Sequence, residues 1–97
     1  MSETACGRVA TGADIGPEHQ GRFVEITTRV AEEAAALGLG EFGQRVTVRG
    51  TVYHARRVTQ AITQYRITLL FLRVRGHDAL MPFNLGDCDP ARVIAEG

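Results

Sequence analysis

The chain has 97 residues, which is the size of one domain with one modest core. An apolar content of 44% and a charged content of 23% are typical of a globular protein and exclude an intrinsically disordered chain. Eleven acidic and eleven basic residues give a net charge of zero, and every basic residue is an arginine, whose planar guanidinium group suits phosphate or carboxylate.

Cysteines and apolar runs bear on the compartment of the protein. Cys6 and Cys88 lie far apart and are too few to indicate a disulfide scaffold, so we expect free thiols in a reducing compartment. No apolar run follows the first four residues, so no signal peptide is visible. The longest apolar stretch, 67–74, is interrupted by Thr68 and Arg73 and is too short to cross a membrane. We therefore expect a cytoplasmic protein that does not bind membranes.

The first 39 residues predict a tail, then a strand and a helix. Residues 1–16 are small and polar and are expected to form a loose tail, with a single domain over 17–97. A strand over 22–27, capped by Thr28, is expected to precede a helix that ends at Gly38. The alternative is a single helix from Pro17, because five apolar residues also have helical spacing: Phe23, Ile26, Val30, Ala34 and Leu37.

From Arg45 the apolar residues alternate, which predicts a long β-hairpin. Gly50 interrupts the apolar face of the first strand, and we expect a sharp bend or a bulge there. Residues 58–64 are polar and small and should hold the hairpin turn. The return strand, 65–75, is apolar on both faces, as in a central strand or one with a second apolar surface to cover.

The last segments predict short strands. Residues 79–85 should form a short strand, and 86–90 have the composition of a turn. Residues 91–95 fit either a final strand or a helical turn.

This order of elements resembles the SH3-like and Sm-like small barrels. The likeness is carried by 22–26, 46–52 with Gly50, 67–74, 80–85 and 89–94. It implies a mainly β (α+β) fold: a small five-stranded SH3-like barrel with one short helix between strands 1 and 2. The arginine-only, alanine- and glycine-rich composition also resembles that of uncharacterised small proteins of actinobacterial phages.

Positive charge is concentrated in the predicted hairpin. Between Phe42 and His77 there is no acidic residue, whereas acidic residues outnumber arginines on both sides. If the two strands pair, several guanidinium groups can share a face and attract a polyanion, with aromatic side chains beside them to stack on bases. The predicted nucleic-acid-binding residues are Arg45, Arg49, Arg56, Arg57, Arg66, Arg73, Arg75, Tyr53 and Tyr65. Alternatively, these arginines solvate an exposed strand or pair with the carboxylates of Glu25, Glu32 and Glu33.

The apolar return strand suggests a second kind of function, that of a phage-type accessory protein that binds an acidic host protein or self-associates as a homodimer. If one face of this strand is core, the other presents Leu70, Leu72 and Val74 as a protein interface. The alternative is that the predicted helix, over 31–37, covers them.

Residues for catalysis or metal binding are not evident. No pair of cysteines or histidines has zinc-ligand spacing, and Asp87-Cys88-Asp89 is more typical of a turn. Cys88 stands between two acids, which disfavours its thiolate. We therefore predict a protein without catalytic activity, cofactor or metal. A weaker hypothesis is that arginine and histidine hold a small anionic ligand, such as a nucleotide, at a subunit boundary.

Overall fold

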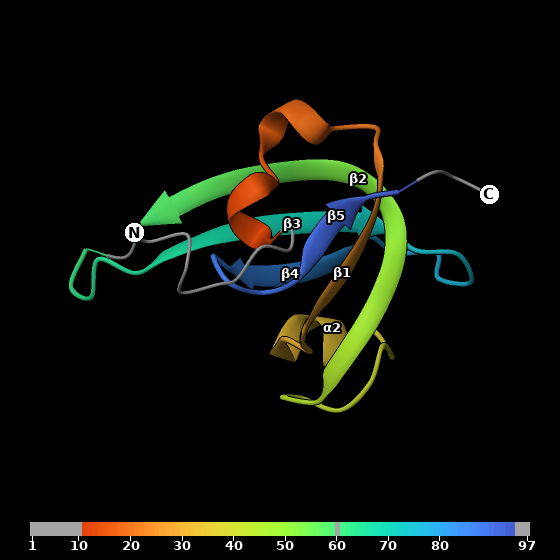
Figure 1. Ribbon diagram of the computed structural model, residues 1–97. Coiled ribbons are helices and arrows are strands. Elements are labelled where there is room, and N and C mark those ends of the chain that lie inside the picture. Colours follow the sequence, from red (N-terminus) through yellow and green to blue (C-terminus); the bar gives the residue numbers. More distant parts are fainter. Residues whose placement is uncertain (1–10, 60, 95–97) are drawn as a thin grey trace.

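The computed structural model describes residues 11–59 and 61–94, which form one antiparallel sheet with little helix (Figure 1). The order of strands across the sheet is β4-β3-β2-β1-β5. The elements are η1 (Gly12–Asp14), η2 (Pro17–His19), β1 (Phe23–Arg29), α2 (Glu32–Ala36), β2 (Arg45–Thr59), β3 (Arg66–Arg73), β4 (Met81–Gly86) and β5 (Ala91–Val93). The predicted mainly β fold is confirmed, and the last segment, which fitted two interpretations, contains a strand.

Strand β1 confirms the strand interpretation of its segment, and the single helix from Pro17 is wrong. Alternate residues of β1 are buried, as in a strand with one face on the core. Thr28 belongs to β1 and does not cap the helix, since α2 follows Ala31 as its N-cap residue. Gly38 has a φ of 89°, a left-handed conformation that favours glycine and suits the end of a helix, as predicted.

Strand β2 curves strongly around the body of the molecule (Figure 1). Gly50 lies on its buried face, where a Cβ atom would come within 2.8 Å of the carbonyl oxygen of Arg73 on β3. The absence of a side chain thus permits the close approach of the two strands at this point. The bulge in their pairing lies slightly further on, between Val52 and His54, where Tyr53 is the extra residue.

The core lies on the concave side of this curved sheet. Paired residues of neighbouring strands place their side chains on the same face, so Val24, Val52 and Leu72 face inward together. The largest fully buried side chains are Phe83, Ile15, Ile26, Leu70, Leu72, Met81 and Leu85. The core is therefore aliphatic, with a single large aromatic ring.

Residues 11–16, predicted as the end of a loose tail, instead pack against the sheet. Ile15 is 1% exposed and belongs to the core, and Thr11 forms a β-bridge with Pro90. Arg57 of β2 donates a hydrogen bond from Nη2 to the carbonyl oxygen of Ala13, at 2.6 Å. The apolar side chain of Ile15 explains the difference, because burying it offsets the cost of ordering this segment. Residues 1–10 of the predicted tail lie outside the described part.

Strands β4 and β5 are the two edges of the sheet, and no pairing joins them in the described part of the chain. The closed barrel is therefore not confirmed. Side chains bridge the opening instead: Thr28 Oγ1 donates to Asp89 Oδ2 at 2.9 Å and lies 3.5 Å from the carbonyl oxygen of Asn84. β5 has only three residues, and the pairing of each is with β1.

Cys88 is disulfide-bonded, so the prediction of a free thiol at this position is wrong. Cys6, the second cysteine of the sequence, lies outside the described residues. The state of Cys88 therefore does not support the expected reducing compartment. Within residues 11–59 and 61–94, helices are all too short to cross a membrane.

Candidate nucleic-acid interface

Five arginines lie on the convex face of the sheet, in rows that cross its strands. The pairing register sets Arg29 opposite Arg45, Glu25 between Arg49 and Arg92, and Thr51 opposite Arg73. We define the basic face as Arg29, Arg45, Arg49, Arg73 and Arg92. All five are exposed.

Glu25 is the acidic residue of this face. Arg49 donates from Nε to Oε2 at 2.9 Å, and Arg92 donates from Nε to Oε1 at 3.1 Å. Hydrogen bonds from Arg49 and Arg92 lower the pKa of Glu25 below its ordinary value of 4.5, and the bond from Arg49 has the larger effect. One carboxylate thus serves two arginines, which leaves the row with an excess of positive charge.

The other three arginines of the basic face form no ion pair within the described residues. Arg29 donates from Nη1 to the carbonyl oxygen of Gly43 at 3.0 Å, which orients its side chain without neutralising it. Arg45 and Arg73 have no such bond to the described part of the chain. Glu32 and Glu33 of α2, which the alternative interpretation paired with arginines, do not form ion pairs there.

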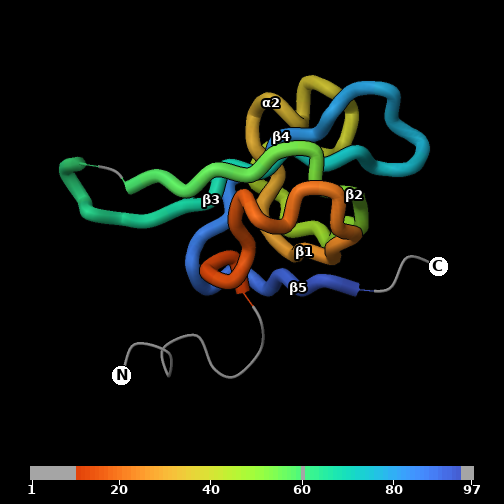
Figure 2. The backbone as a smooth tube through the Cα atoms, turned by 90° about the horizontal axis from the view of Figure 1, so that it is seen from above, coloured from red at the N-terminus to blue at the C-terminus, as the bar shows by residue number. Residues whose placement is uncertain are grey.

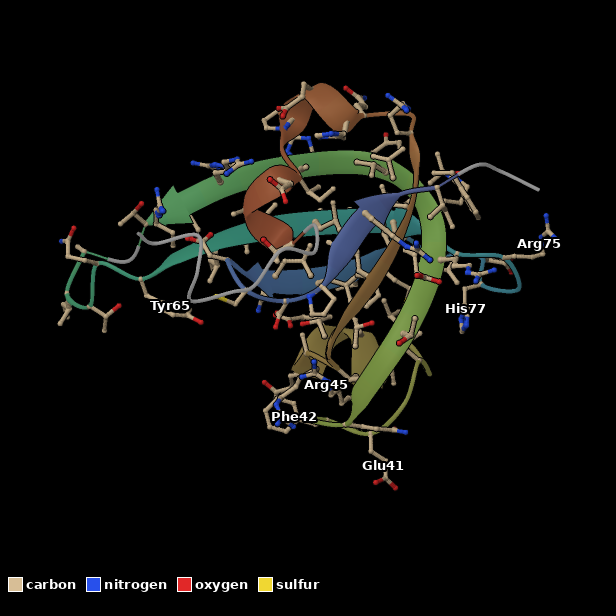
Figure 3. All side chains as sticks on the ribbon, viewed as in Figure 1. Glu41, Phe42, Arg45, Tyr65, Arg75 and His77 are labelled. Carbon is tan, nitrogen blue, oxygen red and sulfur yellow. The ribbon has the colours of Figure 1, made fainter. Side chains whose placement is uncertain are left out.

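The predicted arginine set divides between two faces of the hairpin. Arg45, Arg49 and Arg73 lie on the basic face. Arg56 is also on the convex side, opposite Leu69 and further along the hairpin, which projects away from the body (Figure 2). Arg75 lies in the turn after β3, apart from Arg45 (Figure 3).

Arg57 and Arg66 point to the other side of the hairpin and hold other segments of the fold. Arg57 bonds to the segment before β1, and Arg66 forms an ion pair with Asp87, Nε to Oδ2, at 3.2 Å. Arg57, which was predicted as a binding residue together with Arg45 and Arg49, therefore does not share their face. The bulge at Tyr53 inserts one residue, which reverses the alternation in the second half of β2.

Two members of the basic face, Arg29 and Arg92, were missed. They lie outside the arginine-rich stretch of the sequence, on β1 and β5. The sequence offered one signal for Arg29: if the alternation of β1 is continued to this residue, its side chain points outward with that of Glu25. Strand pairing then brings both residues beside the hairpin arginines.

The aromatic residues of the hairpin lie in different places. Tyr53 is 54% exposed at the bulge, and Tyr65 is 57% exposed near the start of β3. His54 lies against Phe71, with a distance of 6.4 Å between ring centroids. Of these, Tyr65 lines a cleft that also contains two residues of the basic face, Arg29 and Arg45.

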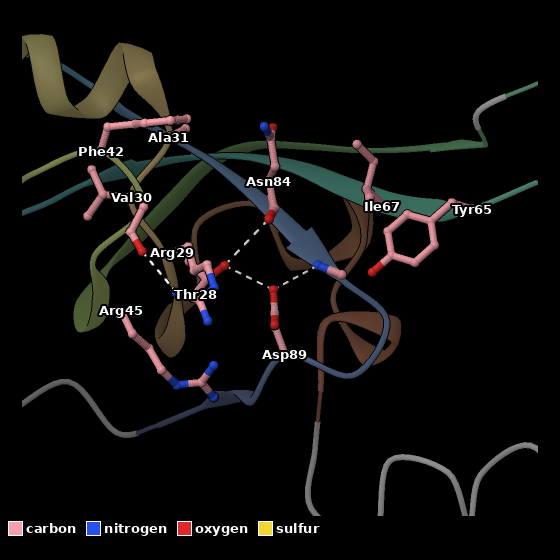
Figure 4. A pocket seen from close by; sticks show the side chains of 12 residues that line it. Thr28, Arg29, Val30, Ala31, Phe42, Arg45, Tyr65, Ile67, Asn84 and Asp89 are labelled. Atoms are coloured by element: carbon pink, nitrogen blue, oxygen red, sulfur yellow. Dashed lines mark hydrogen bonds between the residues drawn. The ribbon is translucent and has the colours of Figure 1, made fainter. Parts of the chain in front are cut away.

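This cleft has a volume of about 560 Å³ and lies where the sheet stays open, between the end of β1 and the edge strand β4 (Figure 4). We call it the seam cleft. Its lining includes Arg29, Arg45, Phe42, Tyr65, Asn84 and Asp89. Two of these six, Arg45 and Tyr65, were predicted from the sequence as binding residues. The other four come from segments that only the tertiary fold brings together.

The protein interface predicted on the return strand is wrong. Leu70 and Leu72 are 0% exposed and belong to the core, and Val74 is packed against it. The outward residues of β3 are Ile67, Leu69 and Phe71, which pair with residues on the convex face. An apolar groove of about 410 Å³ borders Leu69 and Phe71, next to Leu37 at the end of α2. β3 does have a second apolar face, but this face consists of Ile67, Leu69 and Phe71 and not of the predicted residues.

Side-chain clusters that suit a metal ion are absent from the described residues. In comparisons with known proteins, no family model, no curated protein and no solved structure matches this chain.

Proposed function

We propose that this protein is a non-enzymatic binding module that contacts the phosphate backbone of a nucleic acid through the basic face. The observation that carries this proposal is the array of five exposed arginines around one carboxylate, Glu25. A surface with such an excess of guanidinium groups attracts polyanions and releases their counterions on binding.

The opposed pair Arg29 and Arg45 supports an anionic partner. Like charges directly opposite each other destabilise an antiparallel sheet, and no carboxylate of the described residues relieves this pair. A bound phosphate would convert the repulsion into two charge-assisted hydrogen bonds, for which the guanidinium fork is well shaped.

The shape of the face favours contact with the backbone over reading of a duplex groove. The face consists of side chains on four strands rather than of a helix that could enter a groove. From Arg45 to the row of Arg73 it extends about 20 Å along β2, enough to accompany several nucleotides that rise about 3.4 Å each. Little dependence on base sequence is therefore expected from this face alone.

We also infer that the fold is a small SH3-like barrel left open at one seam. The order of strands, the curvature of β2 (Figure 1) and the short turn that leads from β4 into β5 support this assignment. The seam cleft lies at this opening, between β4 and the end of β1 that β5 does not cover.

The test compares two double variants that remove the same charge. Arg45→Ala with Arg49→Ala changes the basic face, whereas Arg56→Ala with Arg75→Ala removes two exposed arginines elsewhere. Binding of a labelled 20-nucleotide single strand would be measured by fluorescence anisotropy between 20 and 300 mM salt. The face variant should bind less tightly, and the slope of log K against log salt should fall by about 0.7 for each phosphate that is no longer neutralised.

The control variant should retain most of the affinity of the original protein. Equally weakened binding in both variants would show that net charge alone matters and would contradict a defined interface. Absence of binding by the unmodified protein at 20 mM salt would also reject the proposal. Circular dichroism of each variant checks that the fold is retained.

A further inference from the structure

We propose that the seam cleft binds one unpaired nucleobase that carries an exocyclic amino group, with its phosphate on Arg29 and Arg45. This inference deepens the proposed function and rests on it. The volume of about 560 Å³ lies within the range of roughly 300–1,000 Å³ found for small-molecule sites. Residues from β1, β2, β3 and β4, and from loops next to these strands, line this volume (Figure 4).

Exposed aromatic rings line the cleft. Phe42 is 73% exposed and Tyr65 is 57% exposed, and the chain has only six phenylalanine and tyrosine residues in all. In Figure 4 the two residues lie on opposite sides of the cleft. Aromatic side chains that are open to solvent stack on unpaired bases.

Gly86 explains the position of Tyr65. A Cβ atom on Gly86 would lie 3.0 Å from the hydroxyl oxygen of Tyr65, so the missing side chain leaves room for the tyrosine to lie across β4. The hydroxyl group of Tyr65 thus lies beside Gly86 in the cleft, where a ligand can reach the ring.

Asp89 supplies a fixed acceptor in the cleft. Its Oδ2 atom accepts hydrogen bonds from Thr28 Oγ1 and from the backbone nitrogen of Gly86, both at 2.9 Å. Its other oxygen, Oδ1, has no hydrogen-bond partner in the described part of the chain. Carboxylates accept from the amino group of cytosine, and Asn84 adds an exposed amide to the same lining. A base with an amino group fits this acceptor better than uracil or thymine.

The arginines supply the site for the phosphate. Arg29 is oriented by its bond to the carbonyl oxygen of Gly43, and Arg45 lies opposite it on β2. Both residues belong to the basic face and to the cleft lining. A nucleic-acid strand that runs along the basic face therefore reaches the cleft at Arg29 and Arg45 and can place one base inside it.

Cytidine and uridine monophosphates form a matched pair of probes, because their bases differ in the amino group and the adjacent ring nitrogen. We would titrate each into the ¹⁵N-labelled full chain at low salt and record amide chemical shifts. Cytidine monophosphate should shift the signals of Tyr65, Gly86 and Asp89 and should bind about fivefold or more tightly than uridine monophosphate. Tyr65→Ala should weaken its binding about tenfold.

Tyr53→Ala is the matched control, because Tyr53 is the other exposed tyrosine of the hairpin and lies outside the cleft. This variant should bind cytidine monophosphate as the original protein does. Shifts that map elsewhere, equal affinity for the two nucleotides, or equally weakened binding in both tyrosine variants would overturn the inference.

The outcomes separate this inference from the proposed function. Oligonucleotide binding that depends on Arg49, together with no mononucleotide binding, would reject the cleft and leave the basic face in place. Mononucleotide binding at Tyr65 without oligonucleotide binding would reject the proposed function and leave a nucleotide site. If neither ligand binds, both are rejected.

Discussion

Glu25 shows how one carboxylate affects both the stability and the charge of the proposed interface. It accepts hydrogen bonds from Arg49 and Arg92, which lie on the strands to either side of β1. These bonds stabilise the sheet across three strands, but they also occupy two guanidinium groups that could otherwise bind phosphate. Glu25 is therefore expected to stabilise the fold and to weaken the binding of phosphate.

The pH dependence of unfolding should reveal the first role. Because the pKa of Glu25 is lower in the folded protein than its ordinary value of 4.5, its contribution to stability is present above that pH and is lost as pH falls through the folded value. Glu25→Gln should therefore lower the free energy of unfolding at pH 7, and its difference from the original protein should shrink below pH 4.5. Urea unfolding at a series of pH values measures this.

The same variant should bind a single-stranded oligonucleotide more tightly, with a steeper dependence on salt, because two arginines are released. Glu41→Gln is the control, since the carboxylate of Glu41 forms no ion pair in the described part of the chain and points away from the molecule (Figure 3). Weaker oligonucleotide binding by Glu25→Gln would contradict the assignment of the basic face.

At the scale of the element, β3 is apolar on both faces, but only one of them is core. Leu70 and Leu72 pair with Ala55 and Val52 on the concave side, whereas Phe71 is 37% exposed on the convex side. The strand is central, with β2 and β4 on its two sides, which accounts for its continuous apolar run.

Substitutions at adjacent positions of β3 should differ strongly in their cost. Leu70→Ala leaves a cavity in the core and should lower the free energy of unfolding by about 2–5 kcal/mol. Phe71→Ala should cost less than about 1.5 kcal/mol, since it removes a partly exposed ring and its contact with His54. Chemical denaturation measures both, and equal costs would mean that the faces of β3 are assigned incorrectly.

At the scale of the whole molecule, the opening of the sheet is bridged by side chains rather than by strand pairing. Thr28 is 2% exposed and joins the end of β1 to Asp89, which also accepts from the backbone of Gly86 at the end of β4. This small network fixes the two sides of the seam cleft relative to each other. Every polar side-chain atom that is fully buried in the described residues has a hydrogen-bond partner.

Two neighbouring threonines test this bridge. Thr28→Val keeps the shape of the side chain and removes its bond to a carboxylate, so it should lower the free energy of unfolding by about 1.5–3 kcal/mol. Thr27→Val removes the bond between Thr27 Oγ1 and Thr47 Oγ1 on the convex face, which should change stability by less than about 0.5 kcal/mol. Thermal or urea unfolding of both variants distinguishes them. Equal effects would show that the seam is not a stabilising contact.

Local patterns of the sequence determined the elements of this fold. Alternation identified β2, the apolar run identified β3, and the β-forming residues of 23–28 identified β1. Three arginines of the basic face, Arg45, Arg49 and Arg73, could be chosen from the sequence because they lie in strands of the arginine-rich hairpin.

Only the tertiary structure decided which residues face each other. Residues 69–72 of β3 are all apolar and do not mark the exposed face, so pairing with β2 and β4 decides that Leu70 is inside and Phe71 outside. The bulge at Tyr53 places Arg57 on the other face of the hairpin, and no local pattern in the sequence indicates this bulge. Arg29 and Arg92 join the basic face through contacts between residues distant in the chain. Such contacts depend on strand register and sheet curvature, which are properties of the assembled sheet rather than of any one segment.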